Sequence, residues 1–430
     1  MLKNKIRKSL KNSFLDGAFF SVMFGAGDAY LNPYAIWMQL TPQQIGLLSS
    51  FPGLFSSVAQ YKSPAIVNIL GRKKTILISV FLQALVWVPI IATAFITGNK
   101  GLFLIFSVTL YSTFNALSGP AWASLMGQYI PSDKRGLYFS WRNKILGFIT
   151  LLSTFFAGII LYFFKLGFFI IFSVAAGCRF ISFFFLTKYY EPKTGNKIVN
   201  RDNFFLYFKN FSSDDFVKFS VFAGLMSFAV YLSVPFFAVY MLRDLGFSYL
   251  KYTIVTTSAS VTLLLTLSAW GKHADSVGNI SVIKLSAMMI SVLPALWIFS
   301  SSTIYLLTVQ IFAGFAWGGF NLAVMNFIYD KSAKEKRISN FSFFNLINGL
   351  GIFAGSITGG FLIPNLPAIS GNKILTLFLI SAIVRFIASV MLSNIKDSKN
   401  VRTVGSFELF FSIIGIKPII GVQQDTVRIE

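Results

Sequence analysis

The chain has 430 residues, of which 55% are hydrophobic and only 12% are charged, against roughly 25% charged in soluble domains. Its mean hydropathy is +0.69, which excludes a disordered chain, a coiled coil and a disulfide scaffold. With one cysteine, Cys178, and one histidine, His273, most metal and nucleophile chemistry is excluded, so we expect no metal, no cofactor and no catalytic residue. The composition indicates a protein of the lipid bilayer.

Twelve mainly apolar stretches are long enough to cross a bilayer as helices. They run roughly over 13–37, 43–61, 75–97, 102–127, 140–164, 166–189, 217–241, 249–270, 280–300, 303–328, 339–363 and 373–394. We therefore expect an all-α polytopic membrane protein with an N-terminal six-helix half at 1–189, a cytoplasmic linker at 190–216, a C-terminal six-helix half at 217–395 and a cytoplasmic tail at 396–430. The apolar run at 407–420 is expected to be an interfacial segment or a disordered tail.

The net charge of +22 reports the orientation of the chain in the membrane. With the N-terminus placed inside, 29 of the 37 Lys and Arg lie on the inner side, 5 lie on the outer side, and Arg179, Lys284 and Arg385 lie within spans. Because basic residues concentrate in cytoplasmic segments, this predicts a multi-pass protein of the plasma (cell) membrane with both termini in the cytoplasm. The basic loops are expected to contact membrane lipids; we expect no nucleic acid as a partner, and a monomer.

The two halves resemble each other at an offset near 205 residues. Lys134, Arg135, Phe139, Ser140, Asn143, Ile145 and Gly147 recur 202 positions later as Lys336, Arg337, Phe341, Ser342, Asn345, Ile347 and Gly349. Pro33 recurs as Pro235 at the same offset, and Arg179 recurs as Arg385. Six spans per repeat keep the same membrane orientation, which is the parallel-repeat scheme of some secondary transporters.

Two short loops carry a recognisable pattern. Gly271, Asp275 and Gly278 resemble the loop signature G-x-x-x-D-R-x-G-R-[RK] of the major facilitator superfamily, with Ser276 where the pattern has a basic residue. The equivalent loop after the second span keeps Gly71, Arg72 and Lys73 but has Asn68 in place of the acid. Segments around Pro120, Trp122, Arg135 and Trp317 also resemble uncharacterised prokaryotic members of that superfamily with twelve spans.

The resemblance implies that these loops control gating. In the superfamily the loop Asp latches the two halves together, so Asp275 is expected to meet the start of the fifth span near Arg142. A neutral Asn68 is expected to cap the start of the eleventh span. The predicted gating residues are Asn68, Gly71, Arg72, Gly271, Asp275, Gly278, Arg135 and Arg337.

Two acids lie within the spans, and an intramembrane carboxylate is a functional candidate by default. Asp16 is near the inner end of the first span, where it is expected to reach the interface or pair with Lys11. Asp28 lies about 18 Å further along the axis. It shares a small, polar helical face with Gly17, Ser21, Gly25 and Asn32. This pattern fits either a helix-packing face or a proton, cation or substrate site centred on Asp28.

Three further spans carry similar polar stripes, on the fourth, seventh and tenth spans. In the superfamily the first, fourth, seventh and tenth spans line the central cavity, so the resemblance predicts a substrate or ion pathway there. Its candidate residues are Asp28, Ser21, Asn32, Asn115, Trp122, Tyr231, Gln310, Trp317 and Asn321. The symmetric Arg179 and Arg385 would lie on the periphery, where we expect a structural role such as snorkelling or bonding to helix ends.

These features predict a secondary active transporter that moves a small-molecule substrate by alternating access, coupled to protons or to a cation such as Na⁺. The chain has no G-x-x-x-x-G-K-[ST] nucleotide-binding run. One alternative is a non-transporting membrane sensor or scaffold with the same fold. A polytopic membrane enzyme is the other, and it is disfavoured because no paired acids lie within the spans.

Overall fold

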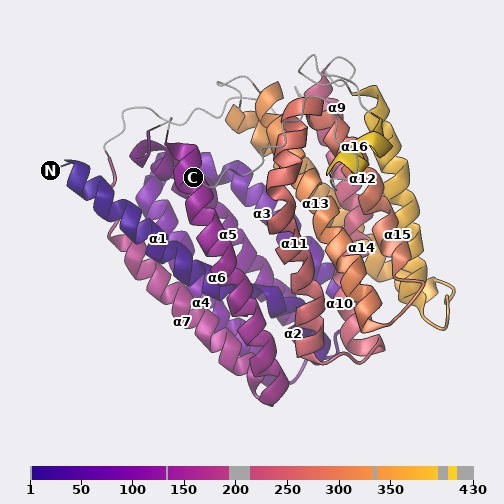
Figure 1. Cartoon of the computed structure of the whole chain (residues 1–430). Helices are drawn as coiled ribbons and strands as arrows, with labels where there is room; N and C mark the ends of the chain where they lie inside the picture. Colours follow the sequence, from indigo (N-terminus) through magenta and orange to yellow (C-terminus); the bar gives the residue numbers. More distant parts are fainter. Residues whose placement is uncertain (1, 132–133, 193–213, 333–336, 396–404, 414–430) are drawn as a thin grey trace, which may run out of the picture.

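The computed structural model describes residues 2–131, 134–192, 214–332, 337–395 and 405–413. Within these residues the chain is built from helices (Figure 1). In the N-terminal half they are α1 (Leu2–Ala26), η1 (Asp28–Tyr30), α2 (Leu31–Trp37), α3 (Pro42–Leu70), α4 (Arg72–Ala92), η2 (Thr93–Phe95), α5 (Lys100–Tyr129), α6 (Arg135–Phe163) and α7 (Gly167–Thr187). In the C-terminal half they are α9 (Asp215–Tyr231), α10 (Val234–Val239), η3 (Tyr240–Asp244), α11 (Tyr249–Val277), α12 (Asn279–Leu296), α13 (Thr303–Lys331), α14 (Arg337–Leu362), η4 (Ile363–Asn365), α15 (Lys373–Val390), η5 (Met391–Asn394) and α16 (Ser406–Ile413).

Ten of the long helical segments are apolar enough and long enough to cross a membrane. The two remaining transverse helices are α1 and α3. The first turns of α1 carry Lys3, Lys5 and Arg7, and α3 packs against both halves of the molecule, on α5 and on α14. Their lower hydropathy is consistent with contact to protein and to a polar cavity rather than to lipid alone.

The two sets of helices pack in the same way, as the sequence repeat predicts. Helix α1 packs on α6 and α7 as α9 packs on α14 and α15; α3 packs on α5 as α11 packs on α13; and α4 packs on α5 and α7 as α12 packs on α13 and α15. Contacts between the halves are made chiefly by α3 with α14 and by α6 with α11. The expected all-α fold of two six-helix repeats is confirmed.

The first and seventh spans are each broken at equivalent places. The first is interrupted at 27–30, between α1 and α2, and the seventh at 232–233, between α9 and α10. Pro33 and Pro235 lie in the short second helices. Because proline has no backbone N–H, it leaves the carbonyl four residues earlier without its helical partner. The break in the first span also ends the helical register that the stripe from Gly17 to Asn32 assumed.

Glycines allow two close helix contacts. On α14, a Cβ atom at Gly351, Gly355 or Gly359 would collide with the backbone oxygens of Gly224, Phe228 and Leu232 on the seventh span. This small-residue ridge therefore fixes the approach of α14 to α9. The turn glycines of the two loop motifs, Gly71 and Gly278, have φ of 84° and 87°. Only glycine adopts this conformation without strain, whereas Gly271 lies inside α11 and makes no turn.

The two ends of the bundle differ in how they are packed. We call the end with the start of α1 and the turns at Gly71 and Gly278 the basic end, and the end with α2 and α10 the opposite end (Figure 1). At the opposite end both halves share one apolar core, which includes Tyr30 and Phe168 from one half and Phe236 from the other. Toward the basic end each half has its own separate core. The halves are therefore closed together at the opposite end and separated at the basic end.

The C-terminal tail holds a short helix that was not predicted. Helix α16 packs on α11 and α12, Leu409 is fully buried, and the Ser412 hydroxyl bonds to His273 Nε2 at 3.0 Å. The expectation of a disordered tail at 407–420 is therefore wrong for 407–413, which form a helix packed on the C-terminal half, and the alternative of an interfacial segment stays a prediction. Residues 414–420 lie outside the described part of the chain.

Candidate functional site

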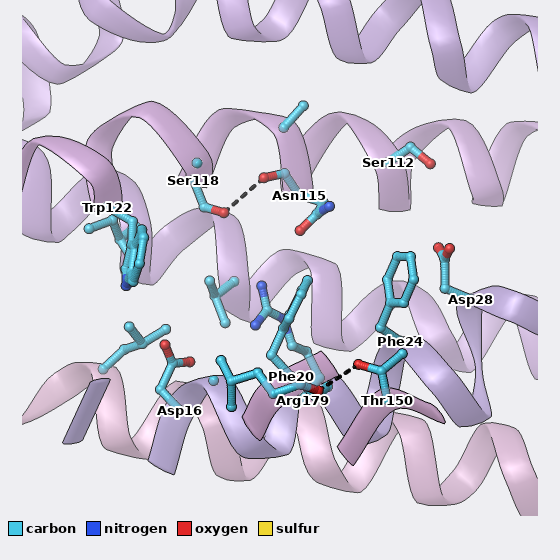
Figure 2. A pocket seen from close by; sticks show the side chains of 18 of the residues that line it. Asp16, Phe20, Phe24, Asp28, Ser112, Asn115, Ser118, Trp122, Thr150 and Arg179 are labelled. Atoms are coloured by element: carbon cyan, nitrogen blue, oxygen red, sulfur yellow. Dashed lines mark hydrogen bonds between the residues drawn. The ribbon is translucent and has the colours of Figure 1, made fainter. Parts of the chain in front are cut away.

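A cavity of about 720 Å³ lies within the N-terminal half. Helices α1, α3, α4, α5, α6 and α7 all contribute to its wall. Figure 2 shows Asp16 and Trp122 at one end of the cavity and Asp28, Phe24 and Ser112 at the other, with Arg179 between them. Amides and hydroxyls complete the polar part of the wall, at Ser21, Ser56, Gln60, Asn115, Ser118, Asn143 and Thr150.

Asp28 is positioned by the break in the first span. It is the first residue of η1, directly after Gly27, and is partly buried. The hydroxyl of Tyr111 lies beside its carboxyl group and donates to the Met23 sulfur at 3.0 Å. Among the described residues no Lys or Arg nitrogen lies within 4.0 Å of this carboxylate. Asp28 is thus a cavity acid without a salt-bridge partner in the described structure.

Asp16 is held differently from what the sequence predicts. It is 6% exposed and accepts hydrogen bonds from Ser182 Oγ at 2.6 Å and from Tyr189 Oη at 3.3 Å. Burial raises the pKa of the Tyr189 phenol, which lies beyond the end of α7. Lys11 is exposed, and the expected pairing of Asp16 with it or with the interface is wrong.

Arg179 belongs to the same network. Its NH1 donates to Ser182 Oγ at 3.0 Å, its Nε donates to Gln83 Oε1 at 2.7 Å, and its guanidinium lies 4.8 Å from the centre of the Phe20 ring. The peripheral position expected for Arg179 is wrong, because α7 packs directly on α1 and turns this side chain into the cavity wall.

Arg385, the repeat equivalent of Arg179, has neutral partners. It donates to Ser381 and Ser233 and to the carbonyl oxygens of Ile290 and Val230. Val230 lies in the last turn of α9, and Ser233 lies in the break of the seventh span. Arg385 therefore bonds to a helix end, as expected for a structural role.

Arg142 on α6 is the second guanidinium in the cavity wall. It is 7% exposed, its NH2 donates to the Ser13 carbonyl at 3.0 Å, and its guanidinium carbon lies 4.7 Å from the centre of the Trp122 ring. Asp275 is exposed in the other half. The predicted contact between Asp275 and Arg142 is absent from the described structure, because the halves are separated at the basic end.

A second cavity of about 420 Å³ lies between the halves. It adjoins the first, since Phe24, Gly147 and Thr150 line both. Hydroxyl side chains of α11 form its other wall, at Tyr252, Thr256, Thr257 and Ser260. The sequence reasoning missed this wall, although the spacing of Thr253, Thr256, Thr257 and Ser260 is a helical stripe that could have indicated it.

The predicted pathway residues divide between the halves. Asp28, Ser21, Asn115 and Trp122 line the larger cavity. Neither described cavity is lined by Asn32, Tyr231, Gln310, Trp317 or Asn321. Other residues of the stripes on the seventh and tenth spans make helix contacts: Gly224 contacts Ile347 of α14, Ser227 donates to Asn348 Oδ1 at 2.6 Å, and Gly314 contacts Ala259 of α11.

Two of the predicted gating residues, Arg72 and Arg135, make hydrogen bonds at helix ends of the basic end. Glu191 Oε1 accepts from the backbone N–H groups of Arg72 and Lys73, at 3.1 and 3.3 Å, where α4 begins. Arg135 donates to the carbonyls of Ile130 and Gly127 at the end of α5. The expected cap by Asn68 falls on residues 333–336, and those residues and the side chain of Arg337 lie outside the described part of the chain. Asp214 caps α9 by accepting from Phe216 N at 2.8 Å.

Solved structures with the same fold are transporters. A structure titled nucleoside transporter NupG (D323A mutant) matches 92% of this chain and 100% of its own with a TM-score of 0.70 at 15% identity. A bacterial homologue of the human lysosomal transporter Spinster, in an inward-facing and occupied conformation, matches 90% and 95% with a TM-score of 0.67 at 13% identity. At these identities the likeness shows the fold alone.

Sequence comparisons agree with the fold. The chain is 31% identical over 109 residues to the efflux pump azaK of Aspergillus niger, a match over 25% of this chain and 23% of that protein. The chain therefore matches less than a quarter of that relative's length. The family model described as Major Facilitator Superfamily matches twice, over residues 17–233 and 219–423. Together these two matches cover most of the sequence, so the chain is a multi-pass membrane protein that belongs to the major facilitator superfamily.

Proposed function

We propose that this protein is a secondary active transporter that moves a small solute by alternating access of its two halves, coupled to protons or to a cation such as Na⁺. The observation that carries the proposal is the polar, charged cavity between Asp16 and Asp28 in a molecule whose halves separate at the basic end. We place the basic end on the cytoplasmic side of the cell membrane, because Lys and Arg concentrate in cytoplasmic segments. In this orientation the described state is proposed to be open to the cytoplasm, and we expect the protein to work as a monomer.

Asp28 is our candidate for the coupling site. A carboxylate in a cavity wall without a cationic partner is costly unless it is hydrated, protonated or bound to a cation. It also stands next to the shared core that closes the opposite end, since Tyr30 follows two residues later. A change in the charge of Asp28 would therefore act beside the contact that must open for alternating access.

The two relatives named as a nucleoside transporter and an efflux pump suggest the first solutes to try. Purified protein in liposomes is offered labelled uridine, glucose, leucine, benzoate and ethidium, with and without a pH or Na⁺ gradient. We expect gradient-driven movement of one solute class by the wild-type protein. Absence of protein-dependent movement across this panel and its chemical relatives would favour the non-transporting sensor or scaffold.

The coupling role is tested with Asp28→Asn. We expect this variant to remain folded and to exchange solute across the membrane without accumulating it against a gradient. Glu408→Gln is the matched control, because it removes an exposed acid outside both cavities and should keep coupling. Full gradient-driven accumulation by Asp28→Asn would refute the assignment of coupling to this residue.

A further inference from the structure

We propose that the N-terminal cavity recognises an organic anion through Arg142, so that the transported solute carries a carboxylate or phosphate group. This inference rests on the proposed transport function and specifies its substrate class. The charge, burial and hydrogen bonding of Arg142 carry it, together with the chemistry of the surrounding wall.

Arg142 is a buried cation with an incomplete set of partners. A guanidinium group has five N–H donors. The hydrogen bond of this side chain within the described residues is the one from NH2 to the Ser13 carbonyl, and its Nε–H is buried without a hydrogen-bond partner there. No described carboxylate oxygen lies within 4.0 Å of its nitrogens. The free-energy cost of removing this guanidinium from water exceeds what its contact with the Trp122 ring returns. A buried cation with so few partners therefore needs a counter-ion.

The nearby acid is already engaged. Asp16 accepts from Ser182 and Tyr189, and Ser182 in turn accepts from Arg179. The carboxylate of Asp16 therefore balances the guanidinium of Arg179 through one shared hydroxyl. Asp28 lies at the far end of the cavity (Figure 2). Away from Asp28, the wall of the cavity thus holds two guanidinium groups, of Arg142 and Arg179, and one carboxylate, of Asp16, so this part of the wall carries one unbalanced positive charge.

This positive charge lies on the route from the basic end. Arg142 is two turns into α6, which begins at the basic end with Arg135. The surplus of Lys and Arg at this end produces a positive potential, and such a potential raises the local concentration of anions. Arg is also the side chain whose planar fork matches the two oxygens of a carboxylate or phosphate. A solute that enters from the basic end would meet Arg142 before it reaches Asp28.

The rest of the wall fits an organic anion better than a bare inorganic ion. Phe20, Phe24 and Trp122 present aromatic surface to the cavity, and Asn115 and Asn143 present amides. Phe24 is 40% exposed although it lies inside a span. The volume of about 720 Å³ is within the ordinary range for sites that hold drug-sized ligands.

The test uses ligands of the same shape and different charge. Thermal unfolding of the full-length protein in detergent is followed with benzoate, benzamide and benzamidinium, which are anionic, neutral and cationic, and with phenyl phosphate. Chloride and inorganic phosphate are added in separate samples. We expect benzoate or phenyl phosphate to raise the melting temperature more than the other compounds at millimolar concentration.

Variants then assign the effect to Arg142. Arg142→Gln should lower the affinity for the anion by about tenfold or more, since a charge-assisted hydrogen bond is lost, and Arg142→Lys should retain the preference for anions. Lys144→Gln is the matched control, because it removes an exposed positive charge from the same helix outside the cavity lining. If Arg142→Gln does not fold, phenylglyoxal modification of Arg142 in the wild-type protein is followed by mass spectrometry; benzoate should slow it and benzamidinium should not.

Several results would overturn the inference. In the thermal unfolding assay they are a larger rise of the melting temperature with benzamide or benzamidinium than with the anions, a rise with anions that survives in Arg142→Gln, and no rise with any anion. In the modification assay it is equal protection of Arg142 by benzoate and benzamidinium. An effect of chloride or inorganic phosphate equal to that of the organic anions would restrict the site to simple ions and overturn it too. Liposome uptake of a neutral or cationic solute alone would refute the anion class and leave the transport function standing, whereas no uptake of any solute would refute the transport function itself.

Discussion

The hydroxyl of Tyr30 joins the two halves where they are closed. Its oxygen lies 2.6 Å from Thr253 Oγ1 of α11 and 2.7 Å from the Thr154 carbonyl oxygen of α6. Because the Thr253 hydroxyl donates to the Tyr249 carbonyl, the single Tyr30 proton is shared between these two acceptors. Tyr30 is 1% exposed, and the neighbouring contact of Gly158 with Thr253 leaves no room for a Cβ atom. Opening of the opposite end must break the bond between Tyr30 and Thr253, so Tyr30→Phe should make opening easier.

The size of the effect follows from this single bond. A hydrogen bond between neutral groups contributes about 0.5–1.5 kcal/mol. Thr253 keeps its own hydrogen bond to the Tyr249 carbonyl at 2.7 Å, so the variant leaves no buried donor unsatisfied. The ratio of the state open at the opposite end to the state closed there should therefore rise by about twofold to tenfold.

The assay measures the population of the state that is open at the opposite end. A cysteine introduced by Ala157→Cys, in a Cys178→Ser background, lies in the apolar core that both halves share, since Ala157 belongs to that core and is 1% exposed. Its reaction with a soluble maleimide requires opening, so the labelling rate should rise with the population of the open state. Tyr34→Phe is the matched control, because the Tyr34 hydroxyl bonds to the Ile90 and Ile91 carbonyls of its own half.

Two results would refute this reasoning. An unchanged labelling rate in Tyr30→Phe would show that the bond to Thr253 does not oppose opening. An equal acceleration in Tyr34→Phe would show that the loss of any buried tyrosine hydroxyl loosens the protein without a specific effect between the halves.

Two further predictions concern buried and exposed charges. Ser182→Ala removes the hydroxyl shared by Asp16 and Arg179, and we expect it to lower the free energy of unfolding by about 2 kcal/mol, measured by denaturation in detergent. Ser291→Ala, whose hydroxyl bonds only to its own helix, should lower the free energy of unfolding by less. An equal loss in both variants would contradict the role of the network. Asp275 is exposed here, so Asp275→Ala should leave this state unaffected and weaken only a state closed at the basic end. Cross-linking between the two halves at the basic end should then decrease, and an unchanged yield would count against a latch at this residue.

Several features of the fold follow from local sequence patterns. The apolar stretches predicted the transverse helices, and repeated prolines and glycines marked equivalent breaks and turns, as at Pro33 and Pro235 or Gly71 and Gly278. The glycine ridge on α14 was recognisable because residues four apart share a helical face. These signals are visible in the sequence because bilayer length, helical period and backbone conformation each restrict the residue types at fixed spacings.

The composition of the site depends on contacts that no local pattern contains. Asp16 and Ser182 are separated by 166 positions, and only the packing of α7 on α1 brings Arg179 into the cavity wall. The break at Gly27 removed Asn32 from the predicted stripe, and Gly224, Ser227 and Gly314 of the seventh and tenth spans contact other helices.

The sequence by itself therefore determined the membrane class, the repeat and the family, and it pointed to Asp28 as an acid of the first span, because each of these depends on composition or on spacing along the chain. Only the tertiary structure decided which charges balance one another, that Arg142 stands in the cavity with unused donors, and which end of the molecule is closed. These properties depend on distances between side chains of different helices, and those distances are set by how the helices pack and by which state the two halves adopt.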